Sequence, residues 1–333
     1  MKTIKKLLIL FVILLCFQGA KANWVKQNAN TFAWLLDVYF LNEKTGWISG
    51  SGGTLLATTD GGKTWKKQTG ITEDTIRQIY FSDAQNGWLL CERNIFNRGS
   101  NSSSYILRTS DGGANWERME IVEEGRERIV KIFFDGKNNS FAIGESGALY
   151  ALPSYEDKWR KRASPIRYLL LDGIFTDASH GIIVGAGGTI IFTEDAGATW
   201  NKSNVFGNAK GKFQTVFFVN QKTGWAAGAD GRIFQTVSGG KTWREQKSGV
   251  TTNLTGISFI NSKEGWAVGE QGTILQTTTA GSVWTPYNSK IRHKLEKIFF
   301  VGKKGWIVGF GGTILSTDEE PDSAQKPILK GAK

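Results

Sequence analysis

Seven short apolar runs recur along the chain, and each has the composition of a β-strand. β-branched and aromatic residues dominate the runs, apolar positions alternate within them, and a polar turn follows each one. The runs end in phenylalanine and occupy residues 35–40, 76–81, 129–134, 170–175, 213–218, 254–259 and 295–300. The 3.6-residue apolar period of an amphipathic helix is absent from these units, so the pattern predicts an all-β fold.

A second strand follows each run and makes the repeat regular. It begins with Gly-Trp or a related pair at Gly46, Gly87, Ser140, Gly181, Gly224, Gly265 and Gly305, so that successive starts are 41, 53, 41, 43, 41 and 40 residues apart. A glycine-rich turn such as Gly311-Gly312 then reverses the chain into a third strand, because glycine tolerates positive φ. A period near 40 residues is that of one four-stranded propeller blade.

The turn into the fourth strand carries the most specific motif. Residues 58–65, 109–116 and 193–200 all have the form Ser/Thr-x-Asp-x-Gly-x-x-Trp, an Asp-box, and two later copies have Ser238 and Thr279 in place of the Asp. In such a turn the Asp accepts backbone hydrogen bonds and the Trp packs against the neighbouring sheet. We therefore assign a structural role, not a catalytic one, to the pairs Asp60 and Trp65, Asp111 and Trp116, and Asp195 and Trp200.

The two ends of the repeat array complement each other. The last unit stops after its third strand, whereas residues 24–27 match the fourth-strand sequence at 65–68. We infer that the N-terminal strand completes the last blade and closes a ring of seven, which removes the exposed edges of an open array. The predicted propeller spans residues 23–318, and the polar segment 319–333, with two prolines, is predicted to be a disordered tail.

Residues 1–22 have the three parts of a secretory signal. Three lysines precede the apolar run 7–17, and Ala20-Lys21-Ala22 forms a small-x-small cleavage site. The run is too short for a spanning helix and no second one follows, so we expect a periplasmic or secreted protein that does not cross the membrane. Acylation at Cys16 is the weaker alternative, because Leu15 stands where a lipoprotein signal carries a small residue.

These motifs together resemble a known family. The Asp-boxes, the Gly-Trp-x-x-Gly strand starts and the Ile-x-Phe-Phe strand ends are similar to those of photosystem II stability/assembly factors, and the resemblance extends over about residues 24–318. It implies a seven-bladed propeller of the thylakoid lumen or periplasm with a chaperone-like, non-enzymatic role, which holds a reaction-centre subunit through a basic face. The Asp-box alone is less specific, since sialidases, xyloglucan hydrolases and sortilin-type receptors also carry it.

Basic residues gather where each first strand begins. Of the fourteen positions that lie one and three residues before these strands, seven are basic: Arg126, Arg128, Arg167, Lys210, Lys212, Arg292 and Lys294. We predict that they form one face that binds an acidic segment of a protein partner, such as a membrane-protein subunit, with Arg77 and Trp34 as further candidates. The alternative is a set of solvated loop positions in a lysine-rich chain.

The overall charge is moderate. The formal net charge is +11, from 41 Lys and Arg against 30 Asp and Glu, and removal of the four lysines before residue 23 lowers it to +7. This favours an acidic partner, but no motif for nucleic-acid recognition accompanies it, so we expect no nucleic-acid partner. We also expect a monomer.

Enzyme, cofactor and metal signals are weak. A sialidase-like glycoside hydrolase is the main alternative, together with envelope glycan binding, but it requires a tyrosine nucleophile paired with a glutamate, and only Tyr155-Glu156 suggests one. His180 and His293 are the only histidines and lie in different units, which argues against a metal site. Neither a nucleophile elbow nor a dinucleotide loop is present, so no catalytic residue and no cofactor is predicted.

Overall fold

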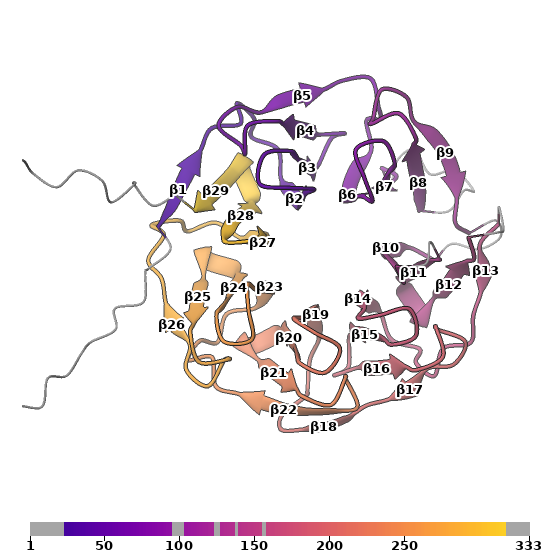
Figure 1. The fold of residues 1–333 in the computed structure, drawn as a ribbon, viewed down its shortest axis with the longest axis vertical. Helices are drawn as coiled ribbons and strands as arrows, with labels where there is room; N and C mark the ends of the chain where they lie inside the picture. Colours follow the sequence, from indigo (N-terminus) through magenta and orange to yellow (C-terminus); the bar gives the residue numbers. More distant parts are fainter. Residues whose placement is uncertain (1–22, 95–102, 123–126, 137–138, 155–157, 318–333) are drawn as a thin grey trace, which may run out of the picture.

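The protein folds as a ring of seven β-sheets around a central opening (Figure 1). The computed structural model describes residues 23–94, 103–122, 127–136, 139–154 and 158–317. The predicted signal segment, residues 1–22, and the predicted tail, residues 319–333, lie outside the described residues. The prediction of a seven-bladed propeller is confirmed.

Each blade begins with a strand that lines the opening. The inner strands are β2 (Leu35–Phe40), β6 (Thr75–Phe81), β10 (Ile129–Phe134), β14 (Leu170–Phe175), β19 (Phe213–Phe218), β23 (Leu254–Phe259) and β27 (Leu295–Val301). We number the blades 1 to 7 in this order. The strands match the apolar runs of the sequence to within one residue.

Second and third strands follow as antiparallel hairpins. The second strands are β3 (Gly46–Gly50), β7 (Gly87–Glu92), β11 (Ser140–Gly144), β15 (Gly181–Gly185), β20 (Gly224–Gly228), β24 (Gly265–Gly269) and β28 (Lys304–Gly309). The third strands are β4 (Leu55–Thr58), β8 (Ser104–Thr109), β12 (Leu149–Leu152), β16 (Ile190–Thr193), β21 (Ile233–Thr236), β25 (Ile274–Thr277) and β29 (Thr313–Thr317).

The outer strands complete the blades and close the ring. They are β5 (Lys66–Gln68), β9 (Glu117–Glu120), β13 (Arg160–Lys161), β17 (Asn201–Lys202), β22 (Thr242–Gln246), β26 (Thr285–Pro286) and, in blade 7, β1 (Trp24–Gln27). Strand β1 pairs antiparallel with β29, with Trp24 opposite Thr317. The inferred closure by the N-terminal strand is thus confirmed.

Blade 5 has a fifth strand that the sequence pattern did not predict. Strand β18 (Asn204–Phe206) follows the short β17 of blade 4 and pairs in parallel with β22. The Arg244 guanidinium carbon lies 5.2 Å from the Phe206 ring centroid. Such a short parallel strand leaves no recognisable pattern in the sequence, because parallel strands are not joined by a tight turn.

The junctions between blades are sealed by aromatic rings, as blade 1 illustrates. Phe40, at the end of β2, stacks on Trp306 of blade 7 with ring centroids 3.5 Å apart and planes 13° apart. Trp65 of the Asp-box meets the same ring edge-on at 5.9 Å. Gly46 stands opposite Phe40 in the strand pair, and a Cβ there would lie 2.3 Å from the Phe40 ring. Glycine is therefore what allows the phenylalanine to fold into the seal.

Candidate functional site

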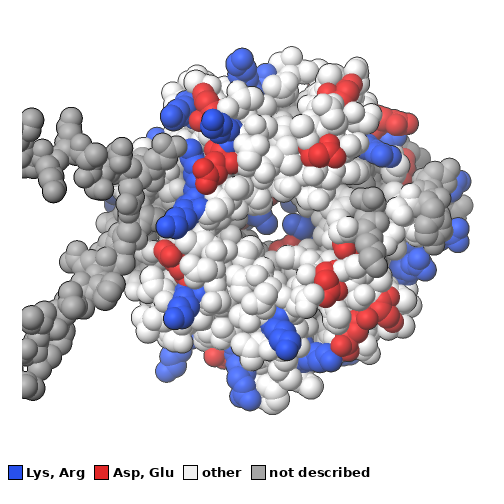
Figure 2. Space-filling model, in the orientation of Figure 1, with Lys and Arg blue, Asp and Glu red and all other residues white. Residues whose placement is uncertain are grey.

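The predicted basic residues that the structure describes lie on one end of the ring, where the inner strands begin. We call this end the upper face and the end with the Asp-box turns the lower face. Figure 2 shows positive and negative side chains interspersed on the face turned to the viewer, and charged atoms inside the central opening. Arg128, Lys212 and Lys294 directly precede β10, β19 and β27. Arg126 lies outside the described residues.

Two arginines of the upper face share an acidic partner. Arg77 forms an ion pair with Glu92, and Arg128 Nη1 lies 3.4 Å from the same carboxylate. Arg128 Nε also lies 3.0 Å from Glu145 Oε1. Partial burial lowers the pKa of Arg77, and the positive charge of the nearby Arg128 lowers it further. The two glutamates balance the two arginines, so this part of the face is close to neutral. Glu92 ends β7 and Glu145 follows β11, so neither stands before an inner strand, where the basic residues were predicted.

On blades 1 and 7, a second cluster combines charge with exposed aromatic surface. Glu296 accepts a 2.8 Å hydrogen bond from Trp34 Nε1 and lies 2.9 Å from Lys294 Nζ. Lys294 Nζ is also 5.4 Å from the Trp34 ring centroid. Trp34 is 39% exposed and meets the 48% exposed Phe310 edge-on. Exposed aromatic pairs of this kind are enriched at protein interfaces.

The four other described cations of the predicted set are exposed. The side chains of Arg167, Lys210, Lys212 and Arg292 are exposed, and none forms an ion pair with another described residue. They belong to the loops that lead into β14, β19 and β27. Unlike Arg128 and Lys294, these four residues retain their full capacity to bind an anionic group.

Sequence reasoning missed a charged layer inside the channel. The third residue of several inner strands points into the channel. Lys131 of blade 3 and Asp172 of the neighbouring blade 4 form an ion pair there, with Lys131 Nζ 3.1 Å from Asp172 Oδ1. The Asp37 carboxylate accepts a 3.1 Å bond from the Ile79 amide, and Asp172 accepts one of 3.0 Å from Val216. These side chains therefore connect neighbouring inner strands. The recurrence of polar residues at the third strand position was the signal that could have revealed them.

The layer carries opposite charges whose pKa values are shifted by burial and by one another. Burial raises the pKa of Asp37, although Lys297 and Lys131 oppose this. Burial also acts to raise the pKa of Asp172, but Lys131 and Lys297 outweigh it and hold that pKa below its usual value. Burial lowers the pKa of Lys297, and the positive charge of Lys131 lowers it further. Lys297 forms no direct ion pair with a described residue.

Below the charged layer the channel is apolar. Tyr39, Tyr80, Phe217 and Phe299 line the same cavity of about 290 Å³ as the charged layer, and the Tyr39 ring lies 5.3 Å from both Tyr80 and Phe299. Burial raises the pKa of both tyrosines. The channel thus changes from charged to aromatic on passing toward the lower face.

The Asp-box carboxylates are engaged within their own turns. Asp60 Oδ1 accepts a 2.9 Å hydrogen bond from the Thr64 amide, and Oδ2 accepts one of 2.6 Å from the Thr64 hydroxyl. Asp111 and Asp195 make the corresponding bonds with Asn115 and Thr199. Hydrogen bonds from Thr64 are the main reason why the pKa of Asp60 is lowered to about 2, and those from Asn115 do the same for Asp111. Such carboxylates serve the turn and are poor proton donors at neutral pH.

Within the described part of the chain, no group of three or more His, Cys, Asp or Glu side chains is placed to hold a metal ion. The same residues include no helix that is long and apolar enough to cross a membrane.

The closed ring and its repeated turns define an Asp-box seven-bladed propeller. The family model described as photosynthesis system II assembly factor YCF48 matches residues 18–97, 152–248 and 241–330, which is more than half of the chain. The chain belongs to this family.

Two curated relatives and one solved structure illustrate the similarity. The photosystem II assembly lipoprotein Ycf48 of Picosynechococcus sp. (strain ATCC 27264 / PCC 7002 / PR-6) is 26% identical over 288 residues, which cover 73% of this chain and 84% of that protein. The protein of the same name from Synechococcus sp. (strain CC9902) is 37% identical over 75 residues, and the match spans 22% of either chain. The structure "YCF48 bound to D1 peptide" has a TM-score of 0.73 at 20% identity and covers 89% of this chain and 95% of that one.

Proposed function

We propose that this chain is an exported, non-catalytic scaffold that binds a protein partner through its upper face, in the manner of an assembly factor. The observation that carries the proposal is the set of four exposed cations without ion-pair partners in the loops that lead into the inner strands: Arg167, Lys210, Lys212 and Arg292. The exposed pair Trp34 and Phe310 belongs to the same face and supplies apolar contact area.

The partner that suits this face carries an acidic segment. Arginine side chains bind carboxylates with two parallel hydrogen bonds, and lysines add charge without fixed geometry. A solved structure of similar fold is described as YCF48 bound to D1 peptide, which supports a peptide segment of a protein partner as the ligand class here. Because the cations are exposed, we expect binding to weaken as ionic strength rises.

Several observations support a non-catalytic role over glycoside hydrolysis. A sialidase-like mechanism needs a tyrosine nucleophile, but burial raises the pKa of the channel tyrosines Tyr39 and Tyr80 and disfavours their phenolate forms. The only adjacent pair suggested by the sequence, Tyr155-Glu156, lies outside the described residues. The Asp-box carboxylates are held ionised by their turns.

An exported location fits the proposed role. The N-terminal 22 residues have the composition of a secretory signal, and the names of two relatives include the word lipoprotein. We propose a periplasmic or secreted protein; N-terminal sequencing of the mature form purified from its host tests cleavage after Ala22.

The binding proposal is tested by capture of a partner from solubilised host membranes. The test variant carries four charge reversals, Arg167→Glu, Lys210→Glu, Lys212→Glu and Arg292→Glu. The matched control reverses four exposed lysines in turns of the lower face, which changes the net charge equally: Lys44→Glu, Lys63→Glu, Lys222→Glu and Lys263→Glu.

We expect the wild type and the lower-face control to recover the same membrane protein and the upper-face variant to lose it. Equal recovery by all three proteins would contradict the proposal and make the cations a solvated rim. A wild type that captures no protein but binds envelope polysaccharide would favour the glycan alternative instead.

A further inference from the structure

The junction between blades 2 and 3 differs from the other junctions in the residue that faces the last phenylalanine of the inner strand. In six blades the last phenylalanine of the inner strand faces a glycine of the second strand, whereas in blade 3 Phe134 faces Ser140. A Cβ at the six glycines would lie between 2.3 and 2.9 Å from the ring of the facing phenylalanine. Contacts this short do not occur in proteins, so a side chain at this position excludes the phenylalanine from its usual place.

Phe134 accordingly occupies a different position. It stacks on the channel residue Tyr80, with centroids 4.3 Å apart and planes 22° apart. Its contact with Trp88 of blade 2 is tilted by 50° at 5.1 Å, compared with 13° and 3.5 Å for the equivalent rings Trp306 and Phe40. Among the described residues, Trp159 makes no edge contact with Phe134, although the equivalent Trp65 contacts Phe40.

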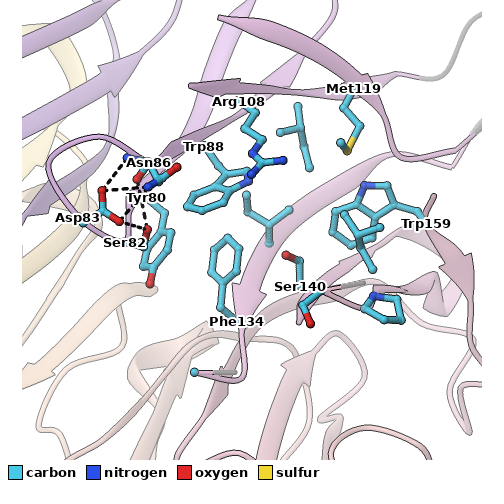
Figure 3. Close-up of a pocket in the computed structure, with 16 residues that line it drawn as sticks. Tyr80, Ser82, Asp83, Asn86, Trp88, Arg108, Met119, Phe134, Ser140 and Trp159 are labelled. Atoms are coloured by element: carbon cyan, nitrogen blue, oxygen red, sulfur yellow. Dashed lines mark hydrogen bonds between the residues drawn. The ribbon is translucent and has the colours of Figure 1, made fainter. Parts of the chain in front are cut away.

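The displaced ring leaves a pocket in the seam. Its volume is about 580 Å³, which is within the range of small-molecule sites. Figure 3 shows Trp88, Phe134 and Trp159 around a common space, with Arg108 and Met119 on the side formed by blade 2. The pocket lies at the ends of the inner strands, on the lower face, and so is separate from the proposed partner-binding residues.

Arg108 is the cation of the pocket that is available to bind a ligand. Its side chain is exposed, makes no ion pair with a described residue, and has its guanidinium carbon 5.9 Å from the Trp88 ring centroid. Asp83, in the turn between β6 and β7 of the same blade, already accepts 2.8 Å hydrogen bonds from the amides of Gln85 and Asn86. The available chemistry is therefore flat aromatic surface beside one cation that forms no ion pair with the described residues.

We propose that this seam pocket binds a small planar aromatic molecule that carries a carboxylate or sulfonate group. The ring stacks among Trp88 and Trp159, and the anionic group takes the guanidinium of Arg108. Aromatic stacking supplies the affinity and the charge-assisted hydrogen bond supplies the orientation. Ser140 creates the space, because it keeps Phe134 out of the seam.

The test uses two fluorescent probes on the mature chain: 8-anilinonaphthalene-1-sulfonate, which is anionic, and N-phenyl-1-naphthylamine, its neutral analogue. We expect the wild type to bind one sulfonate probe per chain in a saturable manner. Arg108→Gln should weaken the sulfonate probe roughly tenfold, the loss expected for one charge-assisted hydrogen bond, and leave the neutral probe unchanged. Arg244→Gln, the matched control beside Phe206, should change neither.

A second pair of variants tests the origin of the pocket. Ser140→Gly should let Phe134 return to the seam and abolish binding of both probes, whereas Ser140→Ala keeps a Cβ and should bind both as the wild type does. Near-ultraviolet circular dichroism checks that each variant is folded. The proposal is overturned if the folded Ser140→Gly chain binds like the wild type, if Arg108→Gln binds the sulfonate probe normally, or if the wild type shows no saturable binding.

Discussion

The junction of blades 7 and 1 and the junction of blades 2 and 3 show how one side chain determines whether the blades meet in a sealed contact or leave a pocket. At the junction of blades 7 and 1, Gly46 gives Phe40 room to lie flat on Trp306, and Phe40 is only 2% exposed. At the junction of blades 2 and 3, Ser140 occupies that room and Phe134 turns to Tyr80. The strand pairing is the same in both places, so the backbone tolerates the exchange and the side-chain packing absorbs it.

Deleting the two phenylalanines should give the largest contrast. Phe40→Ala removes a ring that is packed on both sides, and we expect it to lower the free energy of unfolding by about 3–5 kcal/mol. Phe134→Ala removes a half-buried ring beside an existing pocket, and about 1–2 kcal/mol is expected, since little new cavity forms. Urea unfolding followed by circular dichroism measures both. Equal losses would mean that the two junctions are packed alike.

Importing the blade 3 residue into blade 1 should produce the next largest effect. Gly46→Ser places a Cβ 2.3 Å from the Phe40 ring, and the forced repacking should cost about 1–3 kcal/mol of stability. It should also create a second site for the neutral probe. Ala114→Ser, at an exposed turn position, is the control and should stay within about 0.5 kcal/mol of the wild type. A Gly46→Ser chain as stable as the control would contradict the steric explanation.

The repeat made the ring predictable, and local exceptions to it were harder to interpret. Trp24 was correctly assigned to the last blade because its neighbours match those of Trp65. Ser140 stood out against the glycines of the other units, but its consequence depends on a ring that folds over it from the facing strand. That relation is visible only once Phe134 is placed in space.

The acidic partners of the upper face were missed for a related reason. Glu92 meets Arg77 across a strand pair and Arg128 across a blade junction, and the second of these contacts has no signature in local spacing. The spacing of basic residues therefore predicted the cations but overestimated how many of them are free of ion pairs. Lys131 and Asp172, which contact each other inside the channel, escaped because each was counted as part of an apolar strand.

The Asp-box of blade 1 holds Trp65 against Phe40, so loosening the turn should weaken the seal by a smaller amount. Asp60→Ala removes acceptors for the amide and hydroxyl of Thr64, and a loss of about 1 kcal/mol in unfolding free energy is expected. In blade 5, Ser238 Oγ accepts the same amide bond, from Thr242 at 3.0 Å. Asp60→Ser should therefore retain most of the stability that Asp60→Ala loses; if the two variants are equally unstable, the hydroxyl is no substitute.

Acid should separate the turns with Asp from those with a hydroxyl, and this is the smallest effect. The folded-state pKa of Asp60 and Asp111 is about 2, below the value near 3.9 of an unfolded Asp. Their contribution is therefore complete above about pH 4 and is lost as the pH falls toward 2.

Ser238 and Thr279 do not titrate, so a chain with Asp60→Ser, Asp111→Ser and Asp195→Ser should lose less stability over that interval than the wild type. Asp83, whose pKa is also about 2, remains in both chains and cancels in the comparison. Thermal unfolding at half-unit pH steps measures the difference. Parallel curves for the two proteins would place the acid sensitivity elsewhere, and the paired carboxylate Asp172, whose pKa is also lowered, would be the next residue to replace.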